Sequence, residues 1–345
     1  NPLFDNVFVF QNTPEMPEIK LGELKLTRLV IEQTSVKFDI AIVLTPTQNG
    51  MEGVIEFKTD LFMPETIQKM ASHFKTLISS VIKKPHSKIG SLNMLTQTER
   101  NQLLETFNSN KASYPQNKTI VDLFEDQVKK SPDAIALKFE GNQLTYAELN
   151  RKANQLARFL IYGGVKKETF VPICIERSLE MIIGILGILK SGGAYVPIDS
   201  NYPQQRINFM LEDCNARIVL ISTKTRAKFS QNVSLEIVAL DSDWSQIAKK
   251  SDINLDISYN QHNVAYVIYT SGSTGIPKGV LVEHQNVVSL VRGVETIALN
   301  KDDILLSTGS ISFDATTYEY WGPLLNGGRL VLCIEDKLLD SRYLK

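Results

Sequence analysis

Cysteine is scarce in this sequence, and the spacing of the cysteines argues against both a metal-binding motif and a disulfide framework. The 345 residues contain three cysteines, Cys174, Cys214 and Cys333. Such wide spacing matches neither a metal-binding motif nor a disulfide framework, so we assign no metal ligands. Unpaired cysteines are typical of a reducing compartment, and we therefore expect a cytoplasmic protein.

The sequence also lacks an excess of either positive or negative charge, and it lacks a hydrophobic stretch long enough to cross a membrane. Lys and Arg total 37 and Asp and Glu total 38, for a formal net charge of −1. This balance argues against a nucleic-acid surface or a polybasic membrane patch. The longest apolar run covers residues 181–189, whereas a helix needs about 20 residues to cross a bilayer. The first residues also lack the basic, cleavable pattern of a signal peptide. From the charge balance and the short apolar runs, we expect neither nucleic-acid nor membrane partners.

The sequence does contain an ordinary globular mixture, 43% hydrophobic and 22% charged, and its pattern changes near residue 95. Before that point, apolar periodicity and turn residues predict strands over 7–10, 38–44 and 53–57, a turn at Asn49–Gly50 and a helix from Pro64. The first segment is therefore expected to combine a small sheet with one amphipathic helix.

The remaining residues alternate between helix and strand. A capping box at Thr96–Glu99 predicts a short helix, and the polar stretch 108–118 predicts a linker. Thr119 and Thr145 each sit where a helix cap is expected. Alternation of this kind favours an α/β fold with a mainly parallel sheet flanked by helices. The strands are expected at 135–139, 170–175, 194–198, 217–221, 236–240, 264–269, 279–282, 304–307 and 329–332.

The loop after the strand 264–269 is the most informative segment. It reads Thr-Ser-Gly-Ser-Thr-Gly-Ile-Pro-Lys-Gly over residues 270–279. Glycines let backbone N–H groups approach an anion, hydroxyls add donors, and lysine adds a positive charge. This composition predicts a site for the phosphates of ATP. Its candidate residues are Thr270, Ser271, Gly272, Ser273, Thr274, Gly275, Lys278 and Gly279.

Two commoner nucleotide motifs do not fit the loop. A Walker loop needs Ser or Thr directly after its lysine, and here Gly279 follows Lys278. A dinucleotide fingerprint needs Gly-x-Gly-x-x-Gly, and the glycines of this loop stand at 272, 275 and 279. A flexible Ser/Gly surface turn remains the alternative for the loop taken alone.

The string from Tyr269 to Gly279 resembles the signature of the adenylate-forming superfamily. That superfamily includes acyl-CoA ligases, luciferases and the adenylation domains of nonribosomal peptide synthetases. Three further strings, 144–149, 189–207 and 313–318, resemble core motifs of those adenylation domains and occur in the same order. One departure is Ser200, at a turn where the family usually has Pro.

The string 1–4 of the first segment resembles the end of a late condensation-domain motif, and the strings 37–39 and 59–62 resemble the closing strands of that domain. Together, the two resemblances imply an α/β fold in two parts. Residues 1–95 would be the chloramphenicol-acetyltransferase-like C-terminal piece of a condensation domain, and residues 96–118 an inter-domain linker. Residues 119–345 would be the large N-terminal subdomain of an adenylation domain, truncated and therefore incomplete.

Several family motifs are missing, so we expect a fragment that is inactive by itself. The condensation motif with two adjacent histidines is absent, as are Tyr-Gly-Pro-Thr-Glu, Arg-Thr-Gly-Asp and the Leu-Gly-Gly-x-Ser carrier site. The small subdomain that carries the catalytic lysine in the family is also absent, so no catalytic residue is assigned.

The resemblance implies activation of an amino acid by ATP with Mg²⁺. The aminoacyl-AMP formed would then load the phosphopantetheine of a neighbouring carrier domain. The implied partners are the amino-acid substrate and the carrier and condensation domains of the same or an adjacent synthetase. Such synthetases belong to secondary metabolite and antibiotic biosynthesis.

Three residues are implied to bind the amino acid. Asp314 matches the residue that holds the α-ammonium group, and the alternative is a helix N-cap. Ala315 and Tyr318 match positions that line the side-chain pocket, and the alternative is ordinary helix packing. A small residue beside an aromatic one favours an uncharged side chain.

Other polar residues are expected to be structural. The four histidines form no cluster, so none is expected to be catalytic. Tyr266 and Tyr269 are expected to pack within a strand.

Two other functions are weighed against amino-acid activation. An acyl-CoA or fatty-acyl-AMP ligase would share the loop but lack the ammonium-binding Asp314 and the condensation segment. A non-enzymatic docking remnant is disfavoured by the intact loop.

Overall fold

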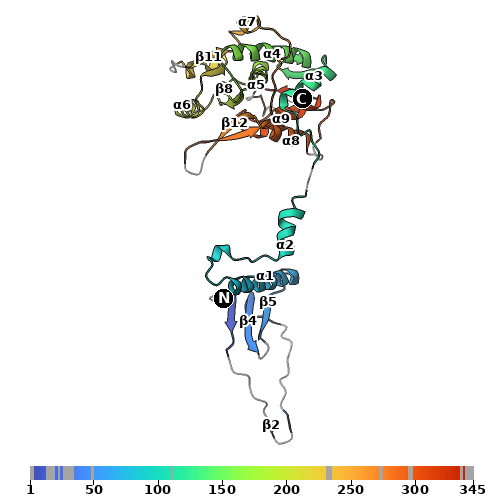
Figure 1. Ribbon diagram of the computed structural model, residues 1–345, viewed down its shortest axis with the longest axis vertical. Coiled ribbons are helices and arrows are strands. Elements are labelled where there is room, and N and C mark those ends of the chain that lie inside the picture. Colours follow the sequence, from blue (N-terminus) through green and yellow to red (C-terminus); the bar gives the residue numbers. More distant parts are fainter. Residues whose placement is uncertain are drawn as a thin grey trace. The chain divides into compact units, whose positions relative to one another are not determined.

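The structure is a computed structural model, and it describes residues 4–12, 20–21, 24–25, 35–47, 50–109, 112–230, 235–271, 275–293, 298–334 and 337–338. The chain divides into two compact units, Asn1–Lys111 and Ala112–Lys345. They are blue to cyan and green to red in Figure 1. We describe each unit by itself.

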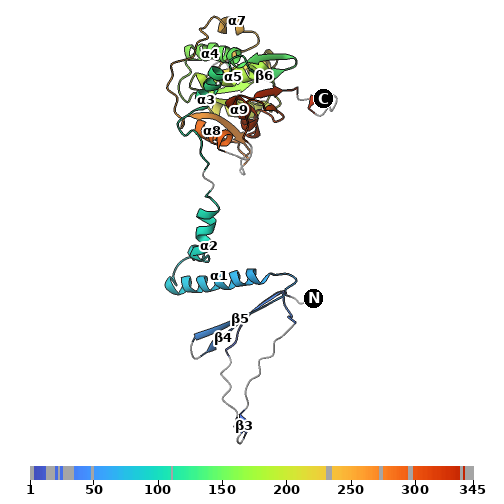
Figure 2. The same ribbon diagram turned by 90° about the vertical axis from the view of Figure 1, so that its right-hand side faces the viewer.

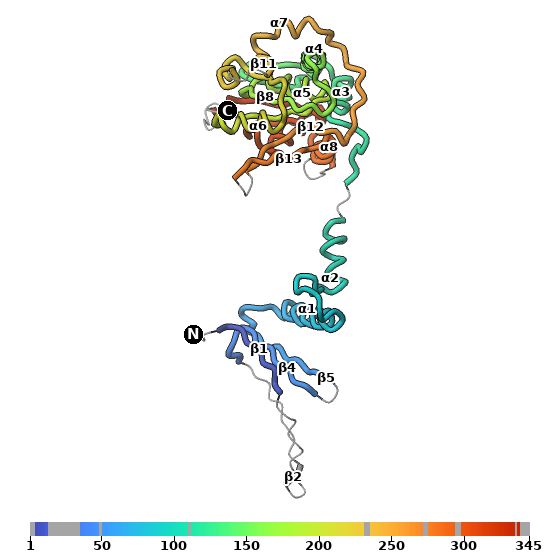
Figure 3. The backbone as a smooth tube through the Cα atoms, turned by 60° about the vertical axis from the view of Figure 1, so that its left-hand side comes forward, coloured from blue at the N-terminus to red at the C-terminus, as the bar shows by residue number. Residues whose placement is uncertain are grey.

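The first unit is built on a three-stranded sheet in the order β1–β4–β5. Strand β1 (Asn6–Phe10) is parallel to β4 (Ile40–Thr47), which is antiparallel to β5 (Gly50–Phe57). Helix α1 (Pro64–Lys83) lies against this sheet (Figure 3) and buries Ile67. The three predicted strands and the predicted helix are confirmed. Of the predicted turn, Gly50 has a φ of 134°, and Asn49 lies outside the described residues.

Shorter elements complete this unit. The predicted capping box is confirmed, because Thr96 Oγ1 accepts from Glu99 N at 3.3 Å and Thr96 N donates to Glu99 Oε2 at 3.0 Å. The short helix that it opens continues as a π-helix, and the apolar side chains of that segment are exposed. The elements are β2 (Lys20–Leu21), β3 (Leu24–Lys25), a 3₁₀ turn (Ile89–Ser91), α2 (Gln97–Asn101) and the π-helix (Gln102–Thr106).

The second unit contains a six-stranded sheet in the order β11–β10–β8–β9–β12–β13. Neighbouring strands are parallel except β12 and β13, which form an antiparallel pair. The strands are β8 (Phe170–Cys174), β9 (Ala194–Pro197), β10 (Ile218–Ile221), β11 (Glu236–Ala239), β12 (Val264–Thr270) and β13 (Lys278–Glu283). All six were predicted and are confirmed.

A second, four-stranded sheet has the order β14–β15–β6–β7. Its strands are β6 (Ile135–Phe139), β7 (Asn142–Thr145), β14 (Ile304–Leu306) and β15 (Arg329–Leu332). We predicted one mainly parallel sheet, and the number of sheets in that prediction was wrong. Apolar periodicity identifies strands, but it does not show which strands are neighbours. Strand β7 was also missed. It follows a two-residue turn in which Glu140 and Gly141 have φ values of 46° and 82°, a hairpin geometry that few residues favour.

Helices cover the sheets of the second unit. Helix α3 packs against both the α4–α5 pair and the α8–α9 pair (Figure 2). In the described part of the chain, no helix is both long and apolar enough to span a membrane. The helices are α3 (Ile120–Lys130), α4 (Tyr146–Tyr162), α5 (Leu179–Lys190), α6 (Gln204–Asp213), a 3₁₀ helix (Thr223–Lys228), α7 (Trp244–Ile247), α8 (His284–Arg292) and α9 (Ala315–Asn326).

Local signals explain where these helices begin and how closely they approach. The cap at Thr145 is confirmed, since its side chain accepts from Glu148 N at 3.2 Å. Helices α4 and α5 touch closely at Gly187, where an added Cβ would lie 2.6 Å from Leu156 Cδ2. A glycine at this point allows the two helices to pack without a gap.

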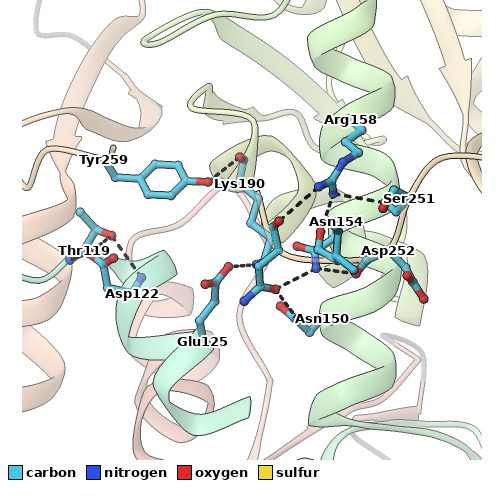
Figure 4. Close-up of polar contacts among 12 residues, drawn as sticks. Thr119, Asp122, Glu125, Asn150, Asn154, Arg158, Lys190, Ser251, Asp252 and Tyr259 are labelled. Atoms are coloured by element: carbon cyan, nitrogen blue, oxygen red, sulfur yellow. Dashed lines mark hydrogen bonds and ion pairs between the residues drawn. The ribbon is translucent and has the colours of Figure 1, made fainter. Parts of the chain in front are cut away.

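A buried lysine joins two of these helices, α5 and α3 (Figure 4). Lys190 of α5 is fully buried and pairs with Glu125 of α3. Burial lowers the pKa of Lys190, and the Glu125 carboxylate opposes that shift. The carbonyl of Lys190 accepts from Tyr259 Oη at 2.7 Å, and Asn154 of α4 donates to the carbonyl of Asp252 at 2.8 Å. The segment that leads into β12 is thereby tied to α4 and α5.

Candidate active site

A cavity of about 900 Å³ opens beside β12 and β13. Its walls come from four separate stretches of the sequence, namely the start of α6, the end of β12, the β13–α8 region and the turn into α9. The lining residues are Tyr202, Arg206, Tyr266, Ile268, Tyr269, Thr270, Ser271, Val280, Val282, Asn286, Val287, Leu290, Ser312, Phe313, Asp314, Ala315, Thr317 and Tyr318.

The predicted phosphate loop lies in the sequence between β12 and β13, which pair as antiparallel neighbours. Thr270 pairs with Lys278 across the two strands, and Tyr269 pairs with Gly279. Thr270 and Ser271 line the cavity, whereas Lys278 is exposed on β13 and is absent from the described lining. The predicted residues Gly272, Ser273 and Thr274 lie outside the described residues.

The two described glycines of the loop are explained by backbone geometry and space. Gly275 has a φ of 80°, a left-handed conformation that side chains disfavour. At Gly279, an added Cβ would lie 2.9 Å from Val267 Cγ1 and 3.3 Å from Tyr269 Cζ. Gly279 is therefore needed to keep Tyr269 in place on the opposite strand.

Asp314 stands at the entrance to α9 and faces the cavity with Ala315 and Tyr318. Asp314 occupies the N-cap position, yet its side chain makes no capping hydrogen bond. The position of Asp314 thus fits the helix-cap alternative, but the capping hydrogen bond of the side chain is not formed. The fold thus brings the stem of the loop and the 314–318 string, distant in sequence, onto one cavity.

A pair of hydroxyls lies next to Asp314. Tyr266 Oη and Thr317 Oγ1 are 2.6 Å apart and buried. Burial raises the pKa of Tyr266, the Thr317 hydrogen bond opposes this, and the negative charge of Asp314 adds to it. Strand packing of Tyr266 is confirmed by its 3% exposure, but its place in the cavity wall was not predicted.

Helix α6 holds Tyr269, the last residue before Thr270, from three positions. Asp213 Oδ2 accepts from Tyr269 Oη at 2.6 Å, and Arg206 Nη2 donates to the Tyr269 carbonyl at 3.4 Å. The ring of Phe209 meets the Tyr269 ring edge-on, with centroids 6.3 Å apart. Residues 206, 209 and 213 share one face of the helix. This spacing is visible in the sequence, but the sequence does not show which strand this face of the helix packs against.

The remaining predictions concern residues away from the cavity. The four histidines are absent from its described lining. All three cysteines are free and buried, and burial raises the pKa of Cys174 to about 12. Within the described ranges, no group of three or more His, Cys, Asp or Glu side chains could hold a metal ion.

Fold and cavity together define an α/β protein with a hydroxyl-rich hairpin and an acidic residue on one cavity. A family model described as AMP-binding enzyme matches residues 124–345, more than half of the chain. The chain therefore belongs to the AMP-binding enzyme family. A second model, described as Condensation domain, matches residues 1–104.

Relatives among known proteins match the chain over almost its whole length. Gramicidin S synthase 2 of Aneurinibacillus migulanus is 40% identical over 344 residues, which cover 100% of this chain and 8% of that protein. The dimodular nonribosomal peptide synthase of Bacillus subtilis (strain 168) is 38% identical over 348 residues, which cover 96% of this chain and 14% of that protein. Together with the condensation match, these relatives identify a segment of the nonribosomal peptide synthetase type.

Solved structures agree with this assignment. The nonribosomal peptide synthetase FmoA3 in its AMPPNP-bound form gives a TM-score of 0.78 at 28% identity, covering 95% of this chain and 35% of that chain. Its α-methyl-L-serine-AMP-bound form gives a TM-score of 0.75 at 26% identity, covering 94% and 36%.

Proposed function

We propose that the chain is part of a synthetase module that activates an amino acid with ATP. The observation that carries the proposal is that Thr270 and Ser271 line the same cavity as Asp314. Family membership implies that ATP is used. The chain spans only 8% of gramicidin S synthase 2, so the complete activity is assigned to a longer protein.

The reaction needs an amino-acid carboxylate to meet the α-phosphate of ATP. A carboxylate oxygen forms a bond to that phosphorus while the bond to the β-phosphate oxygen breaks, which yields aminoacyl-AMP and pyrophosphate. Donors placed where charge develops lower the barrier. We assign this role to Thr270 and Ser271 at the described stem of the loop and to Lys278 and Gly279 on β13. We also assign it to the sequence-predicted residues Gly272, Ser273, Thr274 and Gly275.

Asp314 is proposed to bind the α-ammonium group of the amino acid. Its carboxylate has no capping duty and lines the cavity, so it is free to form a charge-assisted contact. Ala315 and Tyr318 are proposed to contact the substrate side chain. The apolar neighbours Ile268 and Leu290 favour an uncharged side chain.

The cavity offers little for Mg²⁺. Magnesium is usually held by phosphate oxygens together with one or two carboxylates. Asp314 is the only carboxylate in the described lining, and we assign it to the ammonium group. We therefore propose that Mg²⁺ arrives with ATP, and we derive no step through it.

The acyl group is proposed to pass to the phosphopantetheine thiolate of a carrier domain, with AMP as the leaving group. Residues 1–95 are proposed to be the end of a condensation domain, 96–118 a linker and 119–345 the adenylation part. We propose the cytoplasm as the compartment, because all three cysteines are free.

Exchange of labelled pyrophosphate into ATP tests the proposal. The assay uses the whole synthetase that contains the chain, with each of the twenty amino acids and a series of fatty acids. We expect exchange with one amino acid or a few similar ones that carry uncharged side chains. Exchange with fatty acids alone would indicate an acyl ligase instead, and no exchange at all would indicate a docking role.

A further inference from the structure

The guanidinium group of Arg206 stands at the base of the phosphate loop. Its Cζ lies 4.0 Å from the centroid of the Tyr202 ring, a stacking contact that fixes the plane of the group. One N–H, at Nη2, donates to the Tyr269 carbonyl at 3.4 Å. The Nε atom is buried and has no hydrogen-bond partner among the residues that the structure describes.

Arg206 is also the only cationic side chain in the described lining of the cavity. It shares that lining with Thr270 and Ser271, which follow directly after the residue whose carbonyl it binds. A guanidinium carries five N–H donors in a planar fork. Within the described part of the chain, the long bond to Tyr269 uses one of them, and the other donors are left for a ligand.

We propose that Arg206 binds a phosphate group of the ATP polyphosphate and of the pyrophosphate that leaves. The inference rests on the proposed function, because it takes the cavity to be the adenylation site. The planar fork of arginine matches phosphate oxygens, and stacking on an aromatic ring leaves the edge of the fork free. A phosphate is favoured over the amino-acid carboxylate because Arg206 adjoins the loop stem, whereas the ammonium is assigned to Asp314 on α9.

A purely structural role makes a different prediction. If Arg206 only fastens the Tyr269 carbonyl, its loss would loosen the whole hairpin and weaken every reactant alike. If it binds phosphate, its loss weakens pyrophosphate and ATP but spares the amino acid. The comparison of KM for pyrophosphate and ATP with KM for the amino acid therefore distinguishes a phosphate-binding residue from a structural one.

The test compares Arg206→Gln and Arg206→Lys in the whole synthetase. Calorimetric titration with inorganic pyrophosphate measures binding directly, and the exchange assay measures KM for pyrophosphate, ATP and the amino acid. We expect Arg206→Gln to weaken pyrophosphate binding about 10- to 100-fold, the usual effect of losing a charge-assisted hydrogen bond. The KM for the amino acid should stay within about 2-fold, well below that effect. Arg206→Lys should recover part of the loss, because the charge is kept without the fork.

Arg217→Gln is the matched control, since Arg217 is an exposed arginine of the same unit outside the described cavity lining. It should bind pyrophosphate like the wild type. Wild-type affinity in Arg206→Gln, or an equal rise in all three Michaelis constants, overturns the inference. If the wild type binds pyrophosphate through Arg206 but exchanges with no amino acid, the phosphate contact of Arg206 is supported and the proposed amino-acid activation fails.

Discussion

The buried histidine His284 should make the second unit sensitive to acid. His284 begins α8 with 3% exposure. Its Nδ1 accepts from Ile120 N, at the start of α3, at 3.4 Å. Burial lowers the pKa of His284 to about 4 and outweighs the opposing charge of Asp122. The neutral ring is therefore the form that the folded state requires.

The sign and size of the effect follow from linkage. Below a pH of about 6.5, His284 becomes protonated in the unfolded chain but stays neutral in the folded chain, because its pKa is lower in the folded chain. The contribution of His284 is therefore fully present above pH 6.5 and is lost as the pH falls toward about 4. With about 1.4 kcal/mol for each unit of pKa difference, the total is about 3 kcal/mol, and about 2 kcal/mol is lost between pH 7 and pH 5.

Urea unfolding followed by tryptophan fluorescence measures this loss. The sequence has two tryptophans, Trp244 and Trp321, and both lie in the second unit, so the signal reports on that unit alone. We expect His284→Gln to be less stable at pH 7 but to lose about 2 kcal/mol less than the wild type on going to pH 5.

His262→Gln serves as the control for this experiment, because the side chain of His262 is 59% exposed. It should keep the wild-type response to pH. Equal losses of unfolding free energy in the wild type and in His284→Gln between pH 7 and pH 5 would refute the reasoning.

Two further predictions concern packing around the site. Lys190→Met should destabilise the second unit by about 3 kcal/mol, since it leaves the Glu125 carboxylate without its partner. Urea unfolding should show a smaller loss of unfolding free energy for the double variant Lys190→Met/Glu125→Gln than for Lys190→Met alone. A double variant as unstable as Lys190→Met would contradict this. Gly279→Ala should cost about 1–3 kcal/mol, because the new methyl group would meet Val267 at 2.9 Å. Adding Val267→Ala should then cost less than the sum of the two single changes, as measured by the same unfolding assay, whereas simple additivity would count against the contact.

Much of the fold was predictable because its signals are local. The capping boxes at Thr96 and Thr145 place helix starts through residues three apart, and apolar periodicity located the strands other than β2, β3 and β7. Strand pairing depends on distant residues, so the division into two sheets could not be predicted. For the same reason, the hairpin between β12 and β13 appeared only with the structure.

The candidate site shows the same division. Thr270, Ser271 and Asp314 were expected from contiguous strings, and the fold places them on one cavity. Arg206 and Tyr266 were not expected, because their position depends on how α6 and α9 pack on β12. Lys278 was expected among the phosphate ligands, but in the structure it lies on β13 outside the described cavity lining.

The most direct test of amino-acid activation at this cavity concerns the proposed contact between Asp314 and the α-ammonium group. The test removes the carboxylate of the protein and, separately, the amino group of the substrate. The exchange assay compares wild type with Asp314→Ala, using the preferred amino acid and its analogue without the α-amino group. Asp302→Ala is the control, since Asp302 is exposed and outside the described lining. We predict that Asp314→Ala loses about 10- to 100-fold in kcat/KM for the amino acid and nothing for the analogue. Equal losses for both compounds, or none for either, would contradict the account.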